Sequence, residues 1–445
     1  MTFPIEPFVF LLVSFMLYSR ALFGPFMFDD RDGLLQNKYI QEKDFKSPLY
    51  MSPWRGLTVA SWALNQCAVA LEFSCPSCGK GGRAVRPWSF RAVNVILHAL
   101  NAVQVTYIAS FHVEHPWLAG LLFAVGPFSV YSVSYITARG PILSTLFALS
   151  GLIAILSGYE IFALPFLVLS FYSKEDGAAF SLTFGAVSFI IGGMWWIWIC
   201  PPLLLLIWKY DRIKRMSTDY MTGAEKMRNG GLPGALPQPQ HGVTNFVENL
   251  LRYPLWTFGL GQAPYHGSGI PTSSIFRMLL AAGFLISLLS AAATIPSFQI
   301  PVALILIGPW ILYILFQTAD ILMEYRNYHS GVGIALLLGL LPISIGWVLA
   351  LFLACRTYQL ARCCANPNLW WEKCLKSGAG EKSRAWQEWA SEHRQAKRLE
   401  EARYGYRKAL NLNPDLCPAR QNLAWLNVQQ GFLEKGLEEI NIAVE

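Results

Sequence analysis

Long stretches without a charged residue constrain this chain more than any other feature. Asp, Glu, Lys and Arg are absent from five runs, at 117–138, 140–159, 177–208, 278–319 and 331–355. A helix of about 20 apolar residues crosses a bilayer core about 30 Å thick, and several of these runs reach that length. Charged residues make up 14% of the 445 residues, whereas soluble proteins contain about 25%. The sequence therefore predicts an all-α, polytopic membrane protein.

About ten apolar segments reach or approach span length. The N-terminal segment is expected to be a retained span, because it lacks the basic start and the small-residue cleavage site of a signal peptide. The run 177–208 fits one long span or two joined by a tight turn, and 331–355, with Pro342 inside it, fits one kinked helix or a re-entrant hairpin. The expected segments are 5–27, 89–111, 117–137, 140–158, 160–173, 177–208, 274–294, 296–318 and 331–355.

Composition divides the chain into two parts. Residues 1–355 are expected to form a transmembrane domain with polar loops at 28–88 and 209–273, and residues 356–445 a polar helical domain. Segment 56–73 alternates apolar and small polar residues, which predicts a helix at the membrane surface. The net charge of +7 is interpreted as membrane topology, because cytoplasmic loops carry excess Lys and Arg. The composition excludes a disordered chain and a nucleic-acid binder built on basic patches.

A period of 34 residues appears in the C-terminal part. It relates Trp389 to Leu423, Ala402 to Gly436, Tyr406 to Ile440, and Ala409 to Ala443. Tetratricopeptide (TPR) repeats have this period, with an early Trp, small residues where two helices approach closely, an aromatic residue and a closing Pro. Trp386 and Pro414 complete this pattern in the first repeat. The sequence predicts a short TPR-like solenoid, and an ordinary amphipathic hairpin is the alternative.

Asp29 and Asp30 directly follow the first expected span. Adjacent carboxylates at the membrane boundary are costly unless they face water, a cation or a reacting group. A carboxylate there can take a proton from an acceptor hydroxyl or amide as the acceptor attacks a lipid-linked substrate. Asp29 and Asp30 are therefore candidate catalytic residues. The alternative is a simple helix boundary, continued by Arg31 and Asp32.

Charged residues also cluster at the ends of other expected spans. Arg139, Lys174 and Arg326 supply basic groups, and Glu175 and Glu324 lie beside two of them as supporting residues. Each alone fits a boundary residue whose charge reaches toward the interface. Together, the basic groups offer what a phosphate or diphosphate head group on a lipid needs.

Cys75 and Cys78 form a CPSC sequence that looks like half of a zinc ribbon. A structural zinc ion needs four ligands, and no second CxxC occurs. Cys363, Cys364 and Cys374 would complete a site only if the C-terminal part returned to this loop, and a local disulfide or redox pair is the alternative. The histidines form no paired metal motif, and the absence of Walker and dinucleotide motifs weighs against an ATP-driven or nicotinamide enzyme.

The order of these features resembles the transmembrane-and-TPR O-mannosyltransferase family and its bacterial relatives, which are glycosyltransferases of the GT-C class. The resemblance covers most of the chain, and the order of the short motifs is its specific part. The motifs are FDD at 28–30, WRGLT at 54–58, FRAVNVILHALNAV at 90–103, LLFAVGPFSVYSVSYITARG at 121–140, SKEDG at 173–177, EYRNY at 324–328 and RTYQLARCCANPNLWWEKCL at 356–375.

The resemblance implies a GT-C-like fold and an inverting transfer of a sugar from a polyprenyl-phosphate donor to a protein, on the extracytoplasmic face. In this family an acidic residue of the first external loop acts as base or orients the acceptor, and Asp29 and Asp30 match it. Arg139, Lys174 and Arg326 match basic positions near the donor phosphate. The lipid-linked sugar is then a substrate, a divalent metal is left open, and the TPR helices bind a protein acceptor or a membrane partner.

Three residues of the third expected span depart from the family pattern. Relatives often carry histidines and an acid there, whereas this chain has Gly126, Ser129 and Tyr131. A catalytically inactive membrane scaffold, or an accessory subunit that kept the fold and the TPR helices, is therefore the alternative to an enzyme. A transporter ranks third, because the sequence lacks mid-membrane charged pairs.

Two expectations concern location. The protein is expected in the bacterial inner membrane rather than in the endoplasmic reticulum. The family places its TPR helices on the face of the catalytic loop, and we follow that placement. Four basic residues follow the last span and by the charge rule favour the cytoplasm instead: Arg356, Arg362, Lys373 and Lys376.

Overall fold

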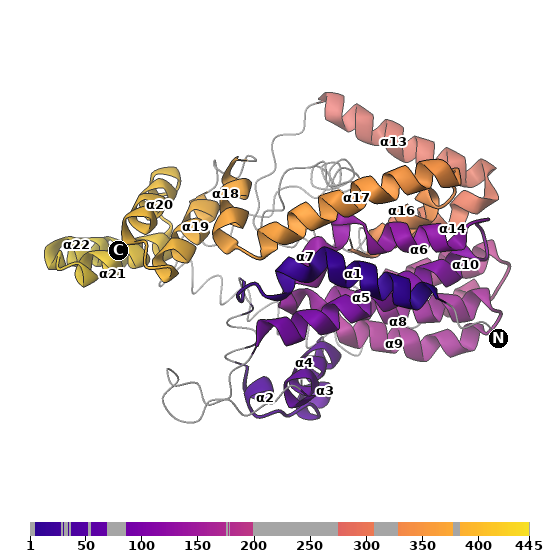
Figure 1. Ribbon diagram of the computed structural model, residues 1–445, viewed down its shortest axis with the longest axis horizontal. Helices are drawn as coiled ribbons and strands as arrows, with labels where there is room; N and C mark the ends of the chain where they lie inside the picture. The colour runs from indigo at the N-terminus through magenta and orange to yellow at the C-terminus, as the bar shows by residue number, and fades with distance from the viewer. Residues whose placement is uncertain are drawn as a thin grey trace.

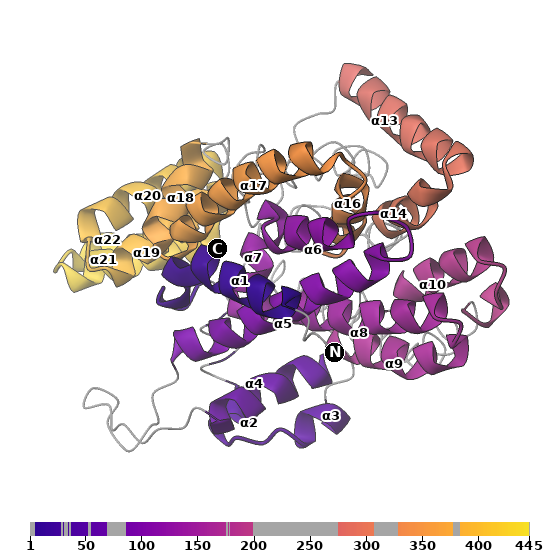
Figure 2. The ribbon, with the colours of Figure 1, turned by 45° about the vertical axis from the view of Figure 1, so that its right-hand side comes forward.

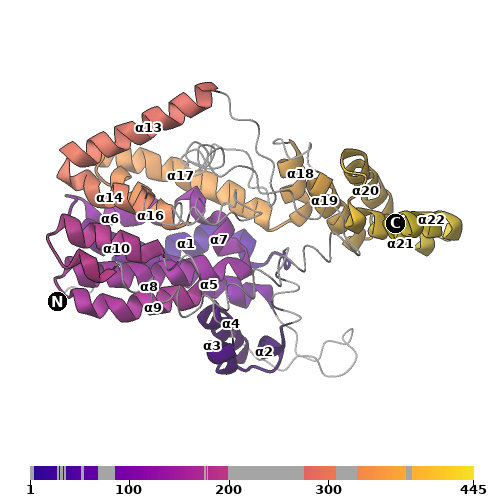
Figure 3. The same ribbon diagram turned by 180° about the vertical axis from the view of Figure 1, so that it is seen from behind.

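The computed structural model describes residues 5–27, 30, 34, 37–51, 55–68, 86–174, 177, 179–198, 275–306, 328–376 and 383–444. Within these ranges the regular structure is helical throughout, which confirms the predicted all-α class. A long helical bundle carries a smaller group of C-terminal helices at one end, as the front and back views both show (Figures 1 and 3).

The bundle is built around α5 (Pro87–Ala109), which packs against α1 (Glu6–Leu22), α6 (Pro116–Ala124) and α8 (Arg139–Leu156). α17 (Ile343–Cys364) lies against α1 and α6. Many outward-facing side chains are apolar as well, for example Leu12, Val348 and Leu351. Helices that are apolar all around belong to membrane spans or large cores. The other bundle helices are α7 (Val130–Ser134), α9 (Ala163–Ser173), α10 (Ala179–Ile190), α13 (Ile275–Thr294), α14 (Pro296–Leu306) and α16 (Tyr328–Leu338).

Three of the described helices are long and apolar enough to cross a membrane: Pro87–Ala109, Ile136–Leu156 and Ile343–Cys364. A fourth is added if Pro116–Ala124 and Pro127–Ser134 count as one span, and these two are bent by 48°. The larger number of spans expected from the sequence is not confirmed. Four further apolar helices are shorter, and parts of the expected segments lie outside the described residues.

The expected span over 117–137 is not one straight helix. α6 ends at Ala124, a 3-10 turn covers Pro127–Ser129, and α7 follows. Pro127 explains the break, because proline has no N–H to continue the helical hydrogen bonds.

Pro342 separates two helices rather than kinking one. α16 ends at Leu338, and α17 begins at Ile343 with Pro342 as its N-cap residue. Proline is tolerated at the start of a helix, where its missing N–H would have no partner. α17 then continues to Cys364, so the predicted domain boundary after Cys355 falls inside this helix.

The described part of the first polar loop forms three short helices, α2 (Lys38–Gln41), α3 (Ser47–Met51) and α4 (Gly56–Ala68). They form a small layer beside the bundle (Figure 2). α4 agrees with the helix predicted from residue 56, and its place at a membrane surface stays a prediction. The hydroxyl of Thr58 donates to the carbonyl of Ser173 at 2.7 Å, which ties α4 to the end of α9.

The C-terminal helices repeat at the predicted spacing. α21 (Cys417–Gln429) starts 34 residues after α19 (Ser383–Gln395), and α22 (Leu433–Val444) starts 34 residues after α20 (Leu399–Leu412). Before them, α18 (Pro367–Lys376) packs its tryptophans into the bundle core. The assignment of the repeat to the TPR class stays a prediction.

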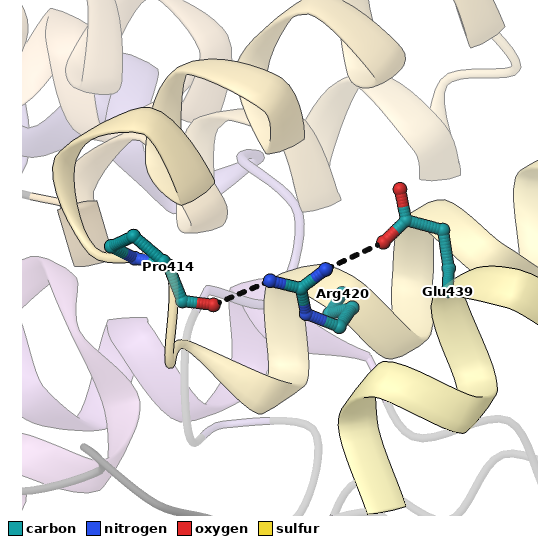
Figure 4. Close-up of polar contacts among 3 residues, drawn as sticks. All are labelled: Pro414, Arg420 and Glu439. Atoms are coloured by element: carbon teal, nitrogen blue, oxygen red, sulfur yellow. Dashed lines mark hydrogen bonds and ion pairs between the residues drawn. The ribbon is translucent and has the colours of Figure 1, made fainter. Parts of the chain in front are cut away.

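Small residues and one arginine hold the C-terminal hairpins together. Ala402, Tyr406 and Ala409 of α20 are fully buried. A Cβ atom at Gly405 would lie 2.7 Å from the Trp389 ring, so glycine is needed for the close approach of α19 and α20. Arg420 of α21 donates to a Glu439 oxygen of α22 at 2.9 Å and to the Pro414 carbonyl at 2.7 Å (Figure 4).

The C-terminal helices leave the bundle at the end where α1 terminates. A Cβ atom at Gly24, just after α1, would lie 3.0 Å from the Cα of Ala365 and 3.2 Å from the carbonyl oxygen of Cys364. The end of α17 and the end of α1 are therefore in contact. The segment that directly follows α1 and the start of the C-terminal helices therefore share one end of the bundle.

Candidate active site

Asp30 is fully buried beside η3 (Ile136–Ala138), the 3-10 turn that leads into α8. One carboxyl oxygen accepts hydrogen bonds from the backbone N–H and the hydroxyl of Thr137, at 2.9 and 3.2 Å. The other oxygen accepts from the N–H of Met27 at 3.2 Å. These bonds fasten the segment after α1 to the start of α8.

Burial raises the pKa of the Asp30 carboxyl from 3.8 to about 6, although the positive charge of Arg91 and the hydrogen bonds from Thr137 and Met27 act to lower it. Such a carboxyl is mostly ionised at neutral pH but binds a proton more readily than an ordinary aspartate. That combination suits a general base, whose ideal pKa lies near the working pH. Asp29, its predicted companion, lies outside the described residues.

Arg91 is a buried arginine near the start of α5 that the sequence interpretation did not single out. Its guanidinium donates to the carbonyls of Gly24 and Pro25, on the segment that leads to Asp30, and to that of Ser134 at 2.8 Å. A lone arginine inside an expected span that is otherwise free of Asp, Glu, Lys and Arg was the available signal, because such residues are costly in a membrane.

Arg139 is fully buried at the first position of α8. Its five N–H groups meet five protein acceptors, which lie on α4 and α5. The bonds run to Asn94 Oδ1 (2.7 Å), Ser61 O (3.2 Å), Ser61 Oγ (3.3 Å), Asn65 Oδ1 (2.9 Å) and Phe90 O (2.9 Å). Arg139 therefore joins the starts of α5 and α8 to α4. Direct contact with a donor phosphate stays a prediction, and it requires at least one of these bonds to open.

Lys174 follows α9 and is buried, with 4% of its surface exposed. A Cβ atom at Gly140 would lie 3.5 Å from its Cδ, so the lysine stem passes beside the residue that follows Arg139. Arg139 and Lys174 are thus neighbours at the end of the bundle that holds Asp30. Asp30, through Thr137, and Lys174, beside Gly140, thus both lie close in space to the chain on either side of Arg139.

The other predicted residues cannot be placed in this arrangement. Glu175, Glu324 and Arg326, together with Cys75 and Cys78, lie outside the described residues. Among the residues that the structure does describe, no group of three His, Cys, Asp or Glu side chains is arranged to hold a metal ion.

A stripe of polar side chains runs along the buried face of α5. Arg91, Asn94, His98 and Asn101 have at most 1% of their surface exposed. The spacing of three and four residues places them on one face of a helix. Sequence reasoning quoted this segment as a motif but did not recognise the stripe.

The second half of the stripe, His98 and Asn101, belongs to a connected chain of hydrogen bonds. Asn101 Nδ2 donates to the Tyr328 hydroxyl at 3.0 Å, and that hydroxyl pairs with His98 Nδ1 at 2.9 Å. His98 Nε2 pairs with the Ala124 carbonyl at 3.1 Å, and because a carbonyl only accepts, Nε2 carries the proton. Tyr328, the last residue of the EYRNY motif, is thereby held in the core.

The positions that depart from the family pattern are used for packing. The Ser129 hydroxyl bonds to the Tyr18 hydroxyl at 2.7 Å and to the Gly126 carbonyl at 2.6 Å. The Tyr131 ring lies 5.9 Å from that of Trp370 on α18. All three positions are buried. Through these contacts they connect the break after α6 to α1 and to α18.

No protein-family model matches the chain. It is similar to three proteins named protein O-mannosyl-transferases. F38B6.6 of Caenorhabditis elegans is 27% identical over 179 residues, 38% of this chain and 26% of the relative. Tmtc2 of Drosophila melanogaster is 26% identical over 144 residues, 28% of this chain and 14% of the relative. TMTC3 of Homo sapiens is 26% identical over 153 residues, 31% of this chain and 15% of the relative.

The similarity to these relatives is partial in both directions. It spans about a quarter or less of each relative's length, so their whole-protein activities are not carried over with it. The names of the relatives suggest a glycosyltransferase, and the apolar helices of this chain fit a membrane protein. The three relatives are animal proteins, and the expected preference for a bacterial inner membrane has no support from them.

Proposed function

We propose that this chain is a GT-C-type membrane glycosyltransferase that moves a sugar from a polyprenyl-phosphate donor to a protein acceptor. The observation that carries the proposal is the Asp30 carboxyl, which is held by Thr137 and Met27 at the end of the bundle shared by Arg139 and Lys174. Its pKa near 6 suits a base that works at neutral pH. The names of the three relatives make mannose the first sugar to test.

In the proposed reaction the carboxylate of Asp30, or of its sequence neighbour Asp29, takes the proton of an acceptor hydroxyl. The acceptor oxygen forms a bond to the anomeric carbon, and the bond from that carbon to the phosphate oxygen breaks. The polyprenyl phosphate leaves with the negative charge, which Lys174 and Arg326 are proposed to stabilise. Arg139, also predicted near the phosphate, is proposed to act by fixing α4 against the starts of α5 and α8.

The C-terminal helices are proposed to be TPR repeats that bind the protein acceptor. Their spacing of 34 residues and their buried Ala402, Tyr406 and Ala409 support this assignment. The close approach of Gly24 to Ala365, in the turn after α17, supports a position for the start of the C-terminal helices near the segment that leads to Asp30. A polypeptide bound to these helices would then be near the proposed base.

The test is a comparison of cells that lack the endogenous protein and express wild type, Asp29→Asn, Asp30→Asn or the double variant. O-linked mannose on Ser and Thr is measured by mass spectrometry of membrane and secreted proteins. Equal expression with loss of mannosylation in the double variant is the expected result. Unchanged mannosylation in the double variant, at equal expression, contradicts the proposal.

A catalytically inactive scaffold is the second candidate, and one observation favours it. The Ser129 hydroxyl bonds to Tyr18 and to the Gly126 carbonyl, and the Tyr131 ring packs against Trp370, so these positions serve packing. Purification in mild detergent separates the two functions. A stoichiometric protein partner without a bound polyprenyl-phosphate sugar favours the scaffold, whereas that lipid in the purified protein favours the enzyme.

A further inference from the structure

Arg91 is a buried cation whose hydrogen bonds go to main-chain carbonyls. Nε donates to Ser134 O at 2.8 Å, Nη1 to Leu22 O at 3.5 Å and to Gly24 O, and Nη2 to Pro25 O. Leu22 is the last residue of α1, and Gly24 and Pro25 begin the segment that leads to Asp30. The last carbonyls of a helix lack partners inside the helix, and a cation there is favourable.

The turn after α17 holds the same segment from another side. A Cβ atom at Gly24 would lie 3.0 Å from the Cα of Ala365, so only glycine permits this approach without a shift. The segment from Gly24 to Met27 is thus fixed by Arg91, by Ala365 and, at its far end, by the bond from Met27 to Asp30. Little freedom is left to the main chain that delivers the carboxylate.

We propose that Arg91 is the positioning residue of this site: its hydrogen bonds to the carbonyls of Leu22, Gly24 and Pro25 fix the main chain that carries Asp30. The proposal rests on the proposed function, in which Asp30 acts as the base. The hydrogen bonds of Arg91 within the described residues go to main-chain carbonyls, so its effect on the reaction is proposed to pass through Asp30.

Other groups near Asp30 and Arg91 could also influence the pKa of Asp30. Within the described ranges, η3 contributes the neutral Thr137, which donates to Asp30, and α17 contributes Cys364, whose thiol is close enough to act electrostatically on Arg91. The attraction between Arg91 and Asp30 lowers the pKa that burial raises. Without the arginine, the base would therefore become protonated at a higher pH.

The shape of arginine is as important as its charge. A planar guanidinium donates in several fixed directions, and here it serves the ends of α1 and α7 together. Lysine would keep the positive charge but would lack the planar set of N–H donors. The two contributions can thus be separated by two substitutions, Arg91→Gln and Arg91→Lys.

The experiment measures mannose transfer from polyprenyl-phosphate mannose to a Thr-containing peptide between pH 5 and pH 8, with the full-length protein in detergent. Arg20→Gln is the matched control, because Arg20 also lies at the end of α1 and joins it to another helix, through a 3.0 Å bond to the Tyr358 hydroxyl. It removes the same charge from an exposed site.

Wild type is expected to gain activity with rising pH, with a midpoint near pH 6. Arg91→Gln should move this midpoint up by about one pH unit and lower kcat by about 100-fold, with KM nearly unchanged. Arg91→Lys should keep the midpoint and lower kcat by about 10-fold. Arg20→Gln should change neither quantity.

Two results would overturn the proposal. One is a midpoint in Arg91→Gln equal to that of Arg20→Gln, and the other is a kcat in Arg91→Lys within a factor of about two of wild type. The lysine variant keeps the test open if the glutamine variant does not fold.

A second measurement needs no activity and separates failure of the proposed function from failure of this inference. The loss of thermal stability with rising pH, which Asp30 causes, should end near pH 6 in wild type and in Arg20→Gln. It should extend to about pH 7 in Arg91→Gln. An inactive protein that shows this extension contradicts the function but supports the positioning role, and an unchanged profile in Arg91→Gln contradicts that role.

Discussion

The Asp30→Asn substitution is expected to stabilise the protein at neutral pH although it removes the proposed base. The folded protein holds the Asp30 proton more tightly than the unfolded chain, because the pKa rises from 3.8 to about 6. The contribution of this group to stability is therefore complete below about pH 4 and is lost as the pH rises through about 6. Each unit of pKa difference corresponds to about 1.4 kcal/mol, so the loss at pH 7.5 is about 3 kcal/mol.

Asparagine mimics the neutral carboxyl and avoids this loss at every pH. Its carbonyl oxygen can still accept from Thr137, but its NH₂ group cannot accept from the Met27 N–H, which costs about 1 kcal/mol. Asp30→Asn should thus be more stable than wild type by about 2 kcal/mol at pH 7.5 and less stable by about 1 kcal/mol at pH 4. The difference in stability between Asp30→Asn and wild type therefore changes sign between pH 4 and pH 7.5.

The assay is thermal unfolding in detergent, followed by tryptophan fluorescence, for both proteins at half-unit steps from pH 4 to pH 8. Groups other than Asp30 titrate in both proteins and cancel in the difference. A gain in Tm of roughly 2–6 °C at pH 7.5, with a smaller loss at pH 4, is expected. A difference in Tm that is constant over the whole pH range would refute the reasoning, because it would show that Asp30 does not change its protonation between the folded and the unfolded state.

The remaining predictions concern activity and packing. Mannose transfer should rise with pH through a midpoint near 6, where Asp30 ionises, and a flat rate from pH 5 to pH 8 would exclude it as the base. Arg139→Lys should destabilise the bundle by about 3 kcal/mol, because lysine replaces five well-directed N–H donors with three. The loss is measured as a lower Tm. A Tm within 1 °C of wild type counts against the observed bonds. Gly405→Val should destabilise the C-terminal helices by about 1–3 kcal/mol, because the new side chain overlaps the Trp389 ring. Limited proteolysis should then cleave α19–α22 faster than in wild type. Equal cleavage rates would contradict the packing.

The sequence was sufficient for features that depend on composition and period. Charge-free runs predicted helices, the alternation after residue 56 predicted α4, and the 34-residue period predicted the spacing of α19 to α22. The position of Asp30 after the first helix also marked it as a candidate, because a charge at a span end is unusual enough to be noticed. Each of these signals depends on residues that are close together along the chain, so it can be read from a single sequence.

Other features depend on tertiary contacts and could not be predicted in this way. Pro127 breaks the third expected span, but whether a proline kinks, ends or bends a helix depends on what surrounds the freed groups. Arg139 was interpreted as a phosphate ligand from its place at a span end. Its five acceptors come from α4 and α5, which lie between 45 and 78 residues away in the chain. The role of Arg91 was missed for the same reason.

The polar stripe on α5 also fixes the rotation of that helix about its own axis. In lipid the apolar faces of a helix are nearly equivalent, so hydrophobic burial does not select which face turns inward. Successive residues are displaced by about 100° around the axis, and one residue inserted after Val95 would turn the start of α5 by that amount relative to its remainder. His98 could then keep its bond to Tyr328 only if Arg91 pointed away from Gly24. The length of α5 between these two residues is therefore as strictly constrained as their identities, which makes this helix a poor place for insertions or deletions.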